Sequence, residues 1–91
     1  MPKPDPESSI LAFPCDFPIK IMGRTQAGFA QAVIEIVRRH APDFDPATLE
    51  MRPSRQGRHL SLTCTVRAVS RHQLDDLYRE LCDHSMVTMV L

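Results

Sequence analysis

The stretch FPCDFPIKIMGRTQAGFAQAVIEIVRRH, residues Phe13 to His40, changes its hydrophobic period once, near its middle. Phe17, Ile19 and Ile21 alternate with proline, lysine and methionine, which is the period of two expected for a strand with one buried face. From Gln26 onward the apolar residues recur at helical spacing, and they are Phe29, Ala32, Val33, Ile36 and Val37. The stretch therefore predicts a strand, a glycine-bearing turn and an amphipathic helix in succession.

Local signals mark the ends of these two elements. A proline in mid-strand removes a donor from the sheet, so Pro18 is expected at the start of the strand, and Gly23 is expected to end it. Thr25 is the expected N-cap of the helix. Pro42 disfavours helical geometry at the residue before it, so the helix should end near His40.

The remainder of the chain predicts two further strands, a second helix and a last strand, at residues 48–52, 59–68, 71–83 and 86–91. The turn that joins the first two of these strands contains Gly57, which is free to adopt a positive φ. Ser70 followed by Gln73 matches the capping box S-x-x-Q and sets the start of the second helix.

The order strand, helix, strand, strand, helix, strand is that of the α+β ferredoxin-like sandwich, βαββαβ. It has a four-stranded antiparallel sheet with both helices on one face and with the first and third strands at its centre. We expect one such domain at residues 13–91, after a flexible tail at residues 1–12. The fourth strand, MVTMVL, is an uncharged apolar edge, which usually needs cover, either from the N-terminal apolar cluster of Ile10, Leu11 and Phe13 or from a second copy of the chain.

Composition excludes several classes of function. Eleven basic and eleven acidic residues cancel, so the long-range attraction that general nucleic-acid or anionic-membrane binding requires is absent. No apolar run is long enough to span a bilayer, and the first ten residues lack the apolar centre of a secretory signal, so we expect a cytoplasmic protein. Three widely spaced cysteines match neither a disulfide framework nor a zinc site. With no catalytic constellation either, we expect no enzyme, no cofactor and no metal.

The loop before the first helix is the candidate ligand site. Free backbone N–H groups at a helix start, with glycines nearby, can hold a carboxylate or a phosphate. The alternative is that the glycines only permit a tight turn. The candidate ligand-binding residues are Gly23, Arg24, Thr25, Gln26 and Gly28.

Arginines between Glu50 and Asp75 form a second candidate surface, because no acidic residue lies among them. Arg52, Arg55 and Arg58 fall on or beside the predicted hairpin, where they would form an anion site or a patch that docks a partner. The alternative is that the hairpin is simply solvated.

The chain resembles the YbeD-like family of small bacterial proteins of unknown activity. The matching pieces are residues 13–23, residues 39–42, Pro53-Ser54 with Gly57, and residues 87–91. The resemblance implies a ferredoxin-like domain similar to ACT regulatory modules, which bind amino acids at interfaces between paired copies.

Ala27-Gly28-Phe29 is also similar to the Pro-Gly-Leu entry to the first helix of ACT modules, where the loop and the helix start contact the ligand. Those modules often place an acidic residue or an asparagine before that turn, whereas this chain has Arg24 and Thr25. The difference favours a carboxylate over the ammonium group of an amino acid.

These features together predict an ACT-like regulatory or ligand-sensing module that is not catalytic. Its expected ligand is a small carboxylate or an amino acid, and it would act through a metabolic enzyme or a second copy of itself. The alternative is a protein-interaction module without a small ligand, which would use the apolar edge strand or the arginine-bearing hairpin.

Overall fold

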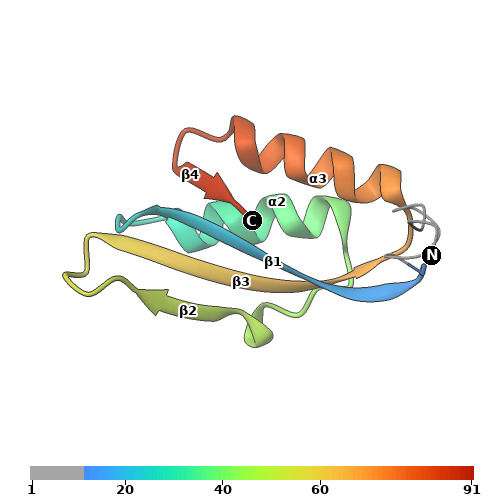
Figure 1. Cartoon of the computed structure of the whole chain (residues 1–91), viewed down its shortest axis with the longest axis horizontal. Coiled ribbons are helices and arrows are strands. Elements are labelled where there is room, and N and C mark those ends of the chain that lie inside the picture. Colours follow the sequence, from blue (N-terminus) through green and yellow to red (C-terminus); the bar gives the residue numbers. More distant parts are fainter. Residues whose placement is uncertain (1–11) are drawn as a thin grey trace, which may run out of the picture.

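Two long antiparallel strands, β1 (Cys15–Arg24) and β3 (His59–Ala68), form the centre of the fold. They pair along their whole length in the computed structural model, which describes residues 12–91. The edge strands are β2 (Glu50–Pro53) beside β3 and β4 (Val87–Val90) beside β1, so the sheet order is β2-β3-β1-β4 (Figure 1). The predicted ferredoxin-like fold is confirmed.

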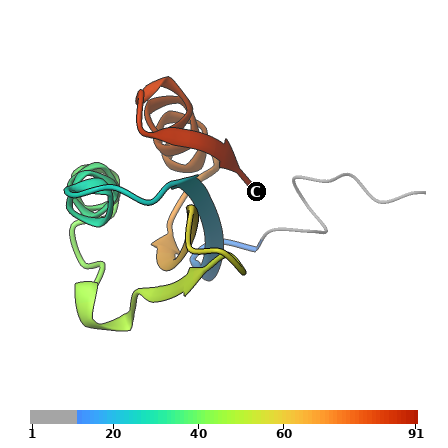
Figure 2. The same cartoon turned by 90° about the vertical axis from the view of Figure 1, so that its left-hand side faces the viewer.

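Both helices, α2 (Phe29–His40) and α3 (Arg71–Asp83), lie on one side of the sheet, as the end-on view in Figure 2 shows. The core fills the space between the helices and the sheet. It is composed mainly of alternate residues of the central strands and one stripe of each helix, including Ile19, Ile21, Leu62, Cys64, Val66, Phe29, Val33, Val37, Leu74, Leu77 and Leu81. The opposite face of the sheet has no helix over it among residues 12–91.

Pro18 lies inside β1 and not at its start, and the direction of the neighbouring hydrogen bonds explains why it is tolerated there. The Lys20 N–H and C=O both bond to Leu91, at 3.3 and 2.8 Å, so they point toward the β4 side. Backbone groups two residues apart in a strand point the same way, so the Pro18 nitrogen faces that side too. Within residues 12–91 no strand lies beside Pro18 there, because β4 pairs with β1 only from Ile21 to Gly23. The missing donor therefore breaks no hydrogen bond of the described sheet.

The first helix begins three residues later than the apolar period suggested, and Thr25 is not its N-cap. Gly28 is the N-cap, at φ 86°, a backbone conformation that glycine adopts without strain. The predicted end at His40 is confirmed.

The other elements differ little from expectation. The predicted bounds of β3 and α3 are confirmed, and Gly57 has the expected positive φ, 75°. The second strand begins at Glu50 because a 3₁₀ turn, Pro46–Thr48, occupies the preceding residues. Residues 1–11 lie outside the described residues, and with them lies almost all of the tail expected at residues 1–12.

Candidate functional site

The loop before α2 and the β2–β3 hairpin, which the sequence presented as two separate surfaces, lie side by side. The Thr25 N–H donates a hydrogen bond of 2.9 Å to the Arg58 carbonyl. One residue earlier, Arg24 is paired with His59 in the β1–β3 ladder. The antiparallel register thus places the end of β1 against the start of β3. Both candidate surfaces consequently occupy the same end of the molecule.

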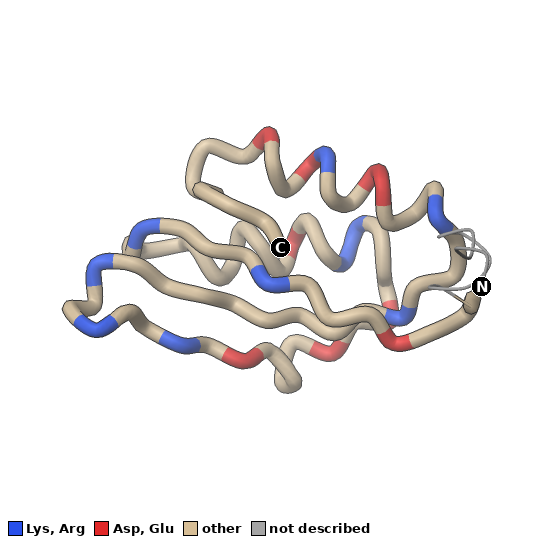
Figure 3. Tube along the Cα trace, in the orientation of Figure 1, with Lys and Arg blue, Asp and Glu red and all other residues tan. Residues whose placement is uncertain are grey.

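We call this end of the molecule the basic end and define it by Arg24, Thr25, Gln26, Gly28, Arg55 and Arg58. It carries positive charge without acidic neighbours in the chain, since residues 17–34 and 51–74 contain no aspartate or glutamate. Figure 3 shows its cations together at the left of the view. None of the three arginines forms an ion pair with another of residues 12–91, whereas Arg67 lies 3.6 Å from the Asp16 carboxylate. The charge is therefore available to an anion from outside.

The predicted ligand residues of the loop fall into two groups. Arg24, Thr25, Gln26 and Gly28 are exposed at the basic end. Gly23 is buried inside β1, and a Cβ atom there would lie 2.3 Å from the Met86 carbonyl oxygen. Close packing therefore accounts for Gly23, whereas the other four residues are open to solvent.

The start of α2 itself offers backbone donors, although the first of them, the Phe29 N–H, already bonds to the Gln26 carbonyl at 3.4 Å. The first N–H groups of an α-helix have no partner within the helix. Gly28, as N-cap, supplies no side chain to accept from them. A carboxylate placed beside Gly28 would find both these N–H groups and the positive end of the helix dipole.

The three hairpin arginines do not form one patch. Arg55 and Arg58 line a depression of about 310 Å³ at the hairpin tip, together with Ser54, Gln56 and His59. Arg52 instead lines two depressions on the open face of the sheet. Arg55 and Arg58 thus line the hairpin tip, and Arg52 lines the open face, while Ser54 and His59 line both the tip depression and one open-face depression.

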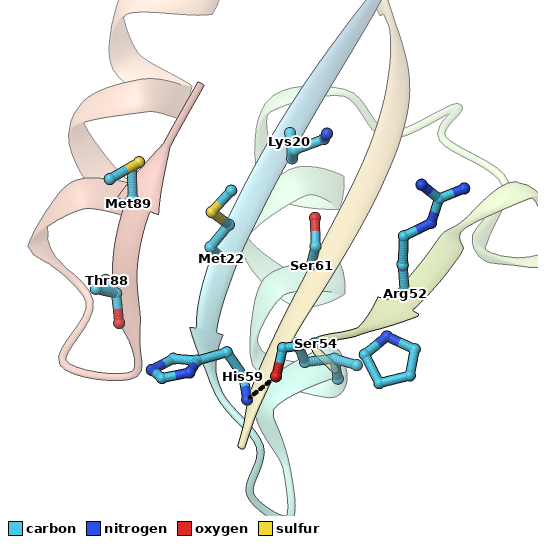
Figure 4. Close-up of a pocket in the computed structure, with 10 residues that line it drawn as sticks. Lys20, Met22, Arg52, Ser54, His59, Ser61, Thr88 and Met89 are labelled. Carbon is cyan, nitrogen blue, oxygen red and sulfur yellow. Dashed lines mark hydrogen bonds between the residues drawn. The ribbon is translucent and has the colours of Figure 1, made fainter. Parts of the chain in front are cut away.

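The larger of these two open-face depressions was not predicted from the sequence. It has a volume of about 310 Å³, and Figure 4 shows it from above. Its lining includes Lys20, Met22, Arg52, His59, Ser61 and Met89. We call it the sheet-face depression. Ser61 alternates with the buried Leu62 in β3 and so faces the open side of the sheet, but only the strand order brings residues from all four strands together.

Two titratable groups within residues 12–91 have raised pKa values. Burial raises the pKa of the Cys64 thiol from 9.0 to about 11, so this thiol is protonated near neutral pH and is a core residue. Burial, and then the nearby Cys82, raise the pKa of Tyr78. No three histidine, cysteine, aspartate or glutamate side chains within residues 12–91 are placed to hold a metal ion. In the same part of the chain, no helix is long and apolar enough to cross a membrane.

Comparison with known proteins gives close relatives and more distant structural neighbours. A UPF0250 protein of Nitrosomonas europaea is 62% identical over 85 residues, which cover 93% of this chain and 98% of the relative. A UPF0250 protein of Bordetella pertussis is 56% identical over 86 residues, 94% of each chain. These identities extend over nearly the whole length of both proteins.

Two solved structures share the fold at low sequence identity. Protein HP0495 of H. pylori matches with a TM-score of 0.73 and 13% identity, over 100% of this chain and 98% of that one. The ACT domain of a GTP pyrophosphokinase of Chlorobium tepidum matches with a TM-score of 0.63 and 17% identity, over 84% of each chain. At such identities the likeness is one of fold.

A family model described as "Protein of unknown function (DUF493)" matches residues 8–91. This match and the UPF0250 relatives agree with the YbeD-like resemblance, since the YbeD-like proteins are the UPF0250 family. The chain belongs to the DUF493 family of UPF0250 proteins.

Proposed function

We propose that this chain is a non-catalytic regulatory module that senses a small carboxylate at its basic end. The observation that carries the proposal is the hydrogen bond between the Thr25 N–H and the Arg58 carbonyl. It holds two segments without acidic residues against each other, so that the arginines of the hairpin tip and Arg24 lie at the end of the sheet where the chain leads into α2.

The chemistry of these groups suits a carboxylate. Arginine offers paired N–H donors in a fixed plane that matches the two oxygens of a carboxylate, and such charge-assisted bonds are stronger than neutral ones. The helix start adds backbone donors and a partial positive charge. A free amino acid would bind through its carboxylate only, because the basic end holds no acidic group for an ammonium.

The ACT-like fold supports a regulatory role. ACT modules are small regulatory domains, and the Chlorobium tepidum neighbour is one such domain of a GTP pyrophosphokinase. In this proposal, occupancy of the basic end changes how the chain contacts a metabolic enzyme or a second copy of itself.

The test is an amide chemical-shift titration of the ¹⁵N-labelled chain against free amino acids and short mono- and dicarboxylic acids. We expect saturable shifts at residues 24–28 and 55–58. Arg24→Ala should weaken the binding about tenfold, the effect of losing about 1.4 kcal/mol of charge-assisted bonding. Arg38→Ala is the matched control, because Arg38 is an exposed arginine near the far end of α2. Equal weakening by both substitutions, or shifts spread over the whole chain, would contradict the proposal.

One observation favours the alternative of a protein-interaction module. The β4 edge exposes apolar side chains, with Met89 49% and Leu91 60% accessible. An uncharged edge strand is a natural site for pairing with another chain. If the titration gives no saturable shift with any acid, a protein partner at this edge becomes the better explanation.

A further inference from the structure

The sheet-face depression meets the hairpin-tip depression at Ser54 and His59, which line both, but it differs from the basic end in chemistry. Its β1–β4 side carries the thioether side chains of Met22 and Met89, while its β3–β2 side carries Ser61 and Arg52 (Figure 4). Lys20 projects between the two sides. The site therefore has an apolar half and a cationic half.

The two cations of the depression are available for binding. Neither Lys20 nor Arg52 forms an ion pair with another described residue, and both side chains are exposed. No acidic residue lines the sheet-face depression itself. Lys20, Arg52 and Ser61 also line the adjoining depression of about 230 Å³, which extends the cationic half toward β2.

From this arrangement we infer that the sheet-face depression binds a small organic anion with a flat apolar body, of the aryl carboxylate type. The anionic head would lie between Lys20 and Arg52 above the Ser61 hydroxyl. The body would cover Met22 and Met89, because thioethers make favourable contacts with aromatic rings and adapt to their shape.

Size and surface chemistry favour a small molecule over a macromolecule. A volume of about 310 Å³ is at the lower end of the range of about 300–1,000 Å³ that is usual for small-molecule sites. Single-stranded nucleic acid would require aromatic side chains on the open face for stacking, and none of the residues that line the two depressions is phenylalanine, tyrosine or tryptophan. The proposal is independent of the carboxylate site at the basic end.

Glu50 limits the charge of the head that the site accepts. It lines the adjoining depression together with Lys20 and Arg52. A carboxylate near the head repels it and opposes the attraction of the two cations. The site should consequently prefer a singly charged head to a phosphate or a dicarboxylate.

The proposal can be tested with three probes and the methyl resonances of the methionines in the full-length chain. The probes are 2-naphthoate, the uncharged 2-naphthamide with the same body, and acetate, which has the head alone. We expect 2-naphthoate to shift the Met22 and Met89 methyls saturably, and 2-naphthamide and acetate to bind at least tenfold more weakly. The Met86 methyl is the internal control, because Met86 does not line the depression.

Substitutions of exposed residues separate the charge effect from apolar adsorption. Lys20→Gln and Arg52→Gln should each weaken 2-naphthoate binding at least fivefold, and Arg38→Gln should leave it unchanged. Glu50→Gln should tighten it two- to fivefold, an effect that loss of a merely structural residue would not produce. Equal binding of 2-naphthoate and 2-naphthamide would overturn the proposal.

Two other results would also overturn it. One is a response confined to the amides of residues 24–28, which would place the anion at the basic end. The other is the absence of any saturable methyl shift with 2-naphthoate, which would leave the open face to a larger partner.

Discussion

At position 23 the chain has room for hydrogen but not for a methyl group. A Cβ atom there would lie 2.3 Å from the Met86 carbonyl oxygen and 2.7 Å from the Phe29 ring. The first contact is with backbone and the second is with a fully buried ring, so neither neighbour can move away freely. Gly23 therefore lets β1, the start of α2 and the turn before β4 approach one another.

We expect Gly23→Ala to destabilise the fold by about 1–3 kcal/mol, the usual cost of overpacking a close-packed site. The measurement is the free energy of unfolding in urea. Gly57→Ala is the control, because nothing lies within 4 Å of its added Cβ and the substitution costs only backbone strain at φ 75°. A smaller loss for Gly23→Ala than for Gly57→Ala would show that the packing argument is wrong.

The Cys64 thiol gives stability a dependence on pH. Its pKa is about 11 in the folded chain, above the ordinary 9.0, because burial disfavours the thiolate. The folded state therefore holds this proton more tightly than the unfolded state. The resulting stability is complete below pH 9 and is lost as the pH rises toward 11.

Between pH 8 and pH 11, this thiol should account for a loss of about 2–3 kcal/mol in the free energy of unfolding. Urea unfolding of the natural chain and of Cys64→Ala at both pH values isolates the effect. Tyr78, whose pKa is also raised, lowers the stability of both proteins in the same direction, so it cancels in the comparison. Equal losses in the two proteins would rule out a role for Cys64.

At the scale of elements, the two helices differ in how their starts are encoded. The Ser70 Oγ accepts a hydrogen bond of 3.0 Å from the Gln73 N–H, so α3 has a side-chain cap that can be read from the sequence. The cap of α2 is Gly28, which carries no side chain and so leaves little signal. The sequence accordingly predicted the start of α3 correctly and placed that of α2 too early.

Gln73 occupies the capping-box position, but its side chain bonds to the residue before the N-cap Ser70 and to two distant carbonyls. Its Oε1 accepts from the Val69 N–H at 2.6 Å, and its Nε2 donates to the carbonyls of His40 at 2.8 Å and Arg67 at 3.3 Å. One side chain thus joins the start of α3 to the end of α2 and the end of β3. Sequence spacing predicted the cap, but the bonds to distant carbonyls depend on tertiary packing.

We expect Gln73→Ala to lower the free energy of unfolding by about 2 kcal/mol, since each net hydrogen bond contributes about 0.5–1.5 kcal/mol. Gln31→Ala is the matched control, because Gln31 is an exposed glutamine on α2 and makes no side-chain hydrogen bond within residues 12–91. Guanidinium unfolding followed by circular dichroism measures both. If the two substitutions have the same effect, the Gln73 bonds do not stabilise the fold.

At the scale of the whole molecule, the strand order determines which residues lie together in each candidate site. The predicted antiparallel order already implied that the loop after β1 meets the hairpin before β3, so the basic end was within reach of sequence reasoning. The sheet-face depression could not be predicted from the sequence in the same way. The β1–β4 register shifts between Met22 and Gly23, so Thr88 and Met89, adjacent in the chain, line the depression together. Simple alternation in the sequence would have placed them on opposite faces.

The neutral net charge of the chain hides an uneven distribution. The basic end gathers arginines that have no acidic partner among the described residues, and like charges held together repel one another. The anion site proposed at the basic end should therefore reduce the stability of the chain when no anion is bound, as functional sites commonly do.

We therefore expect the double substitution Arg55→Gln and Arg58→Gln to stabilise the unliganded chain slightly, by about 0.5 kcal/mol in 10 mM salt. The gain should disappear in 1 M NaCl, where the screening length falls from about 30 Å to about 3 Å. Thermal unfolding at both salt concentrations measures it. Arg67→Gln is the control, because Arg67 lies 3.6 Å from the Asp16 carboxylate and its loss should not stabilise the chain at either concentration. A salt-independent loss of stability in the double variant would mean that Arg55 and Arg58 serve the fold, and that the basic end is not a site kept open for an anion.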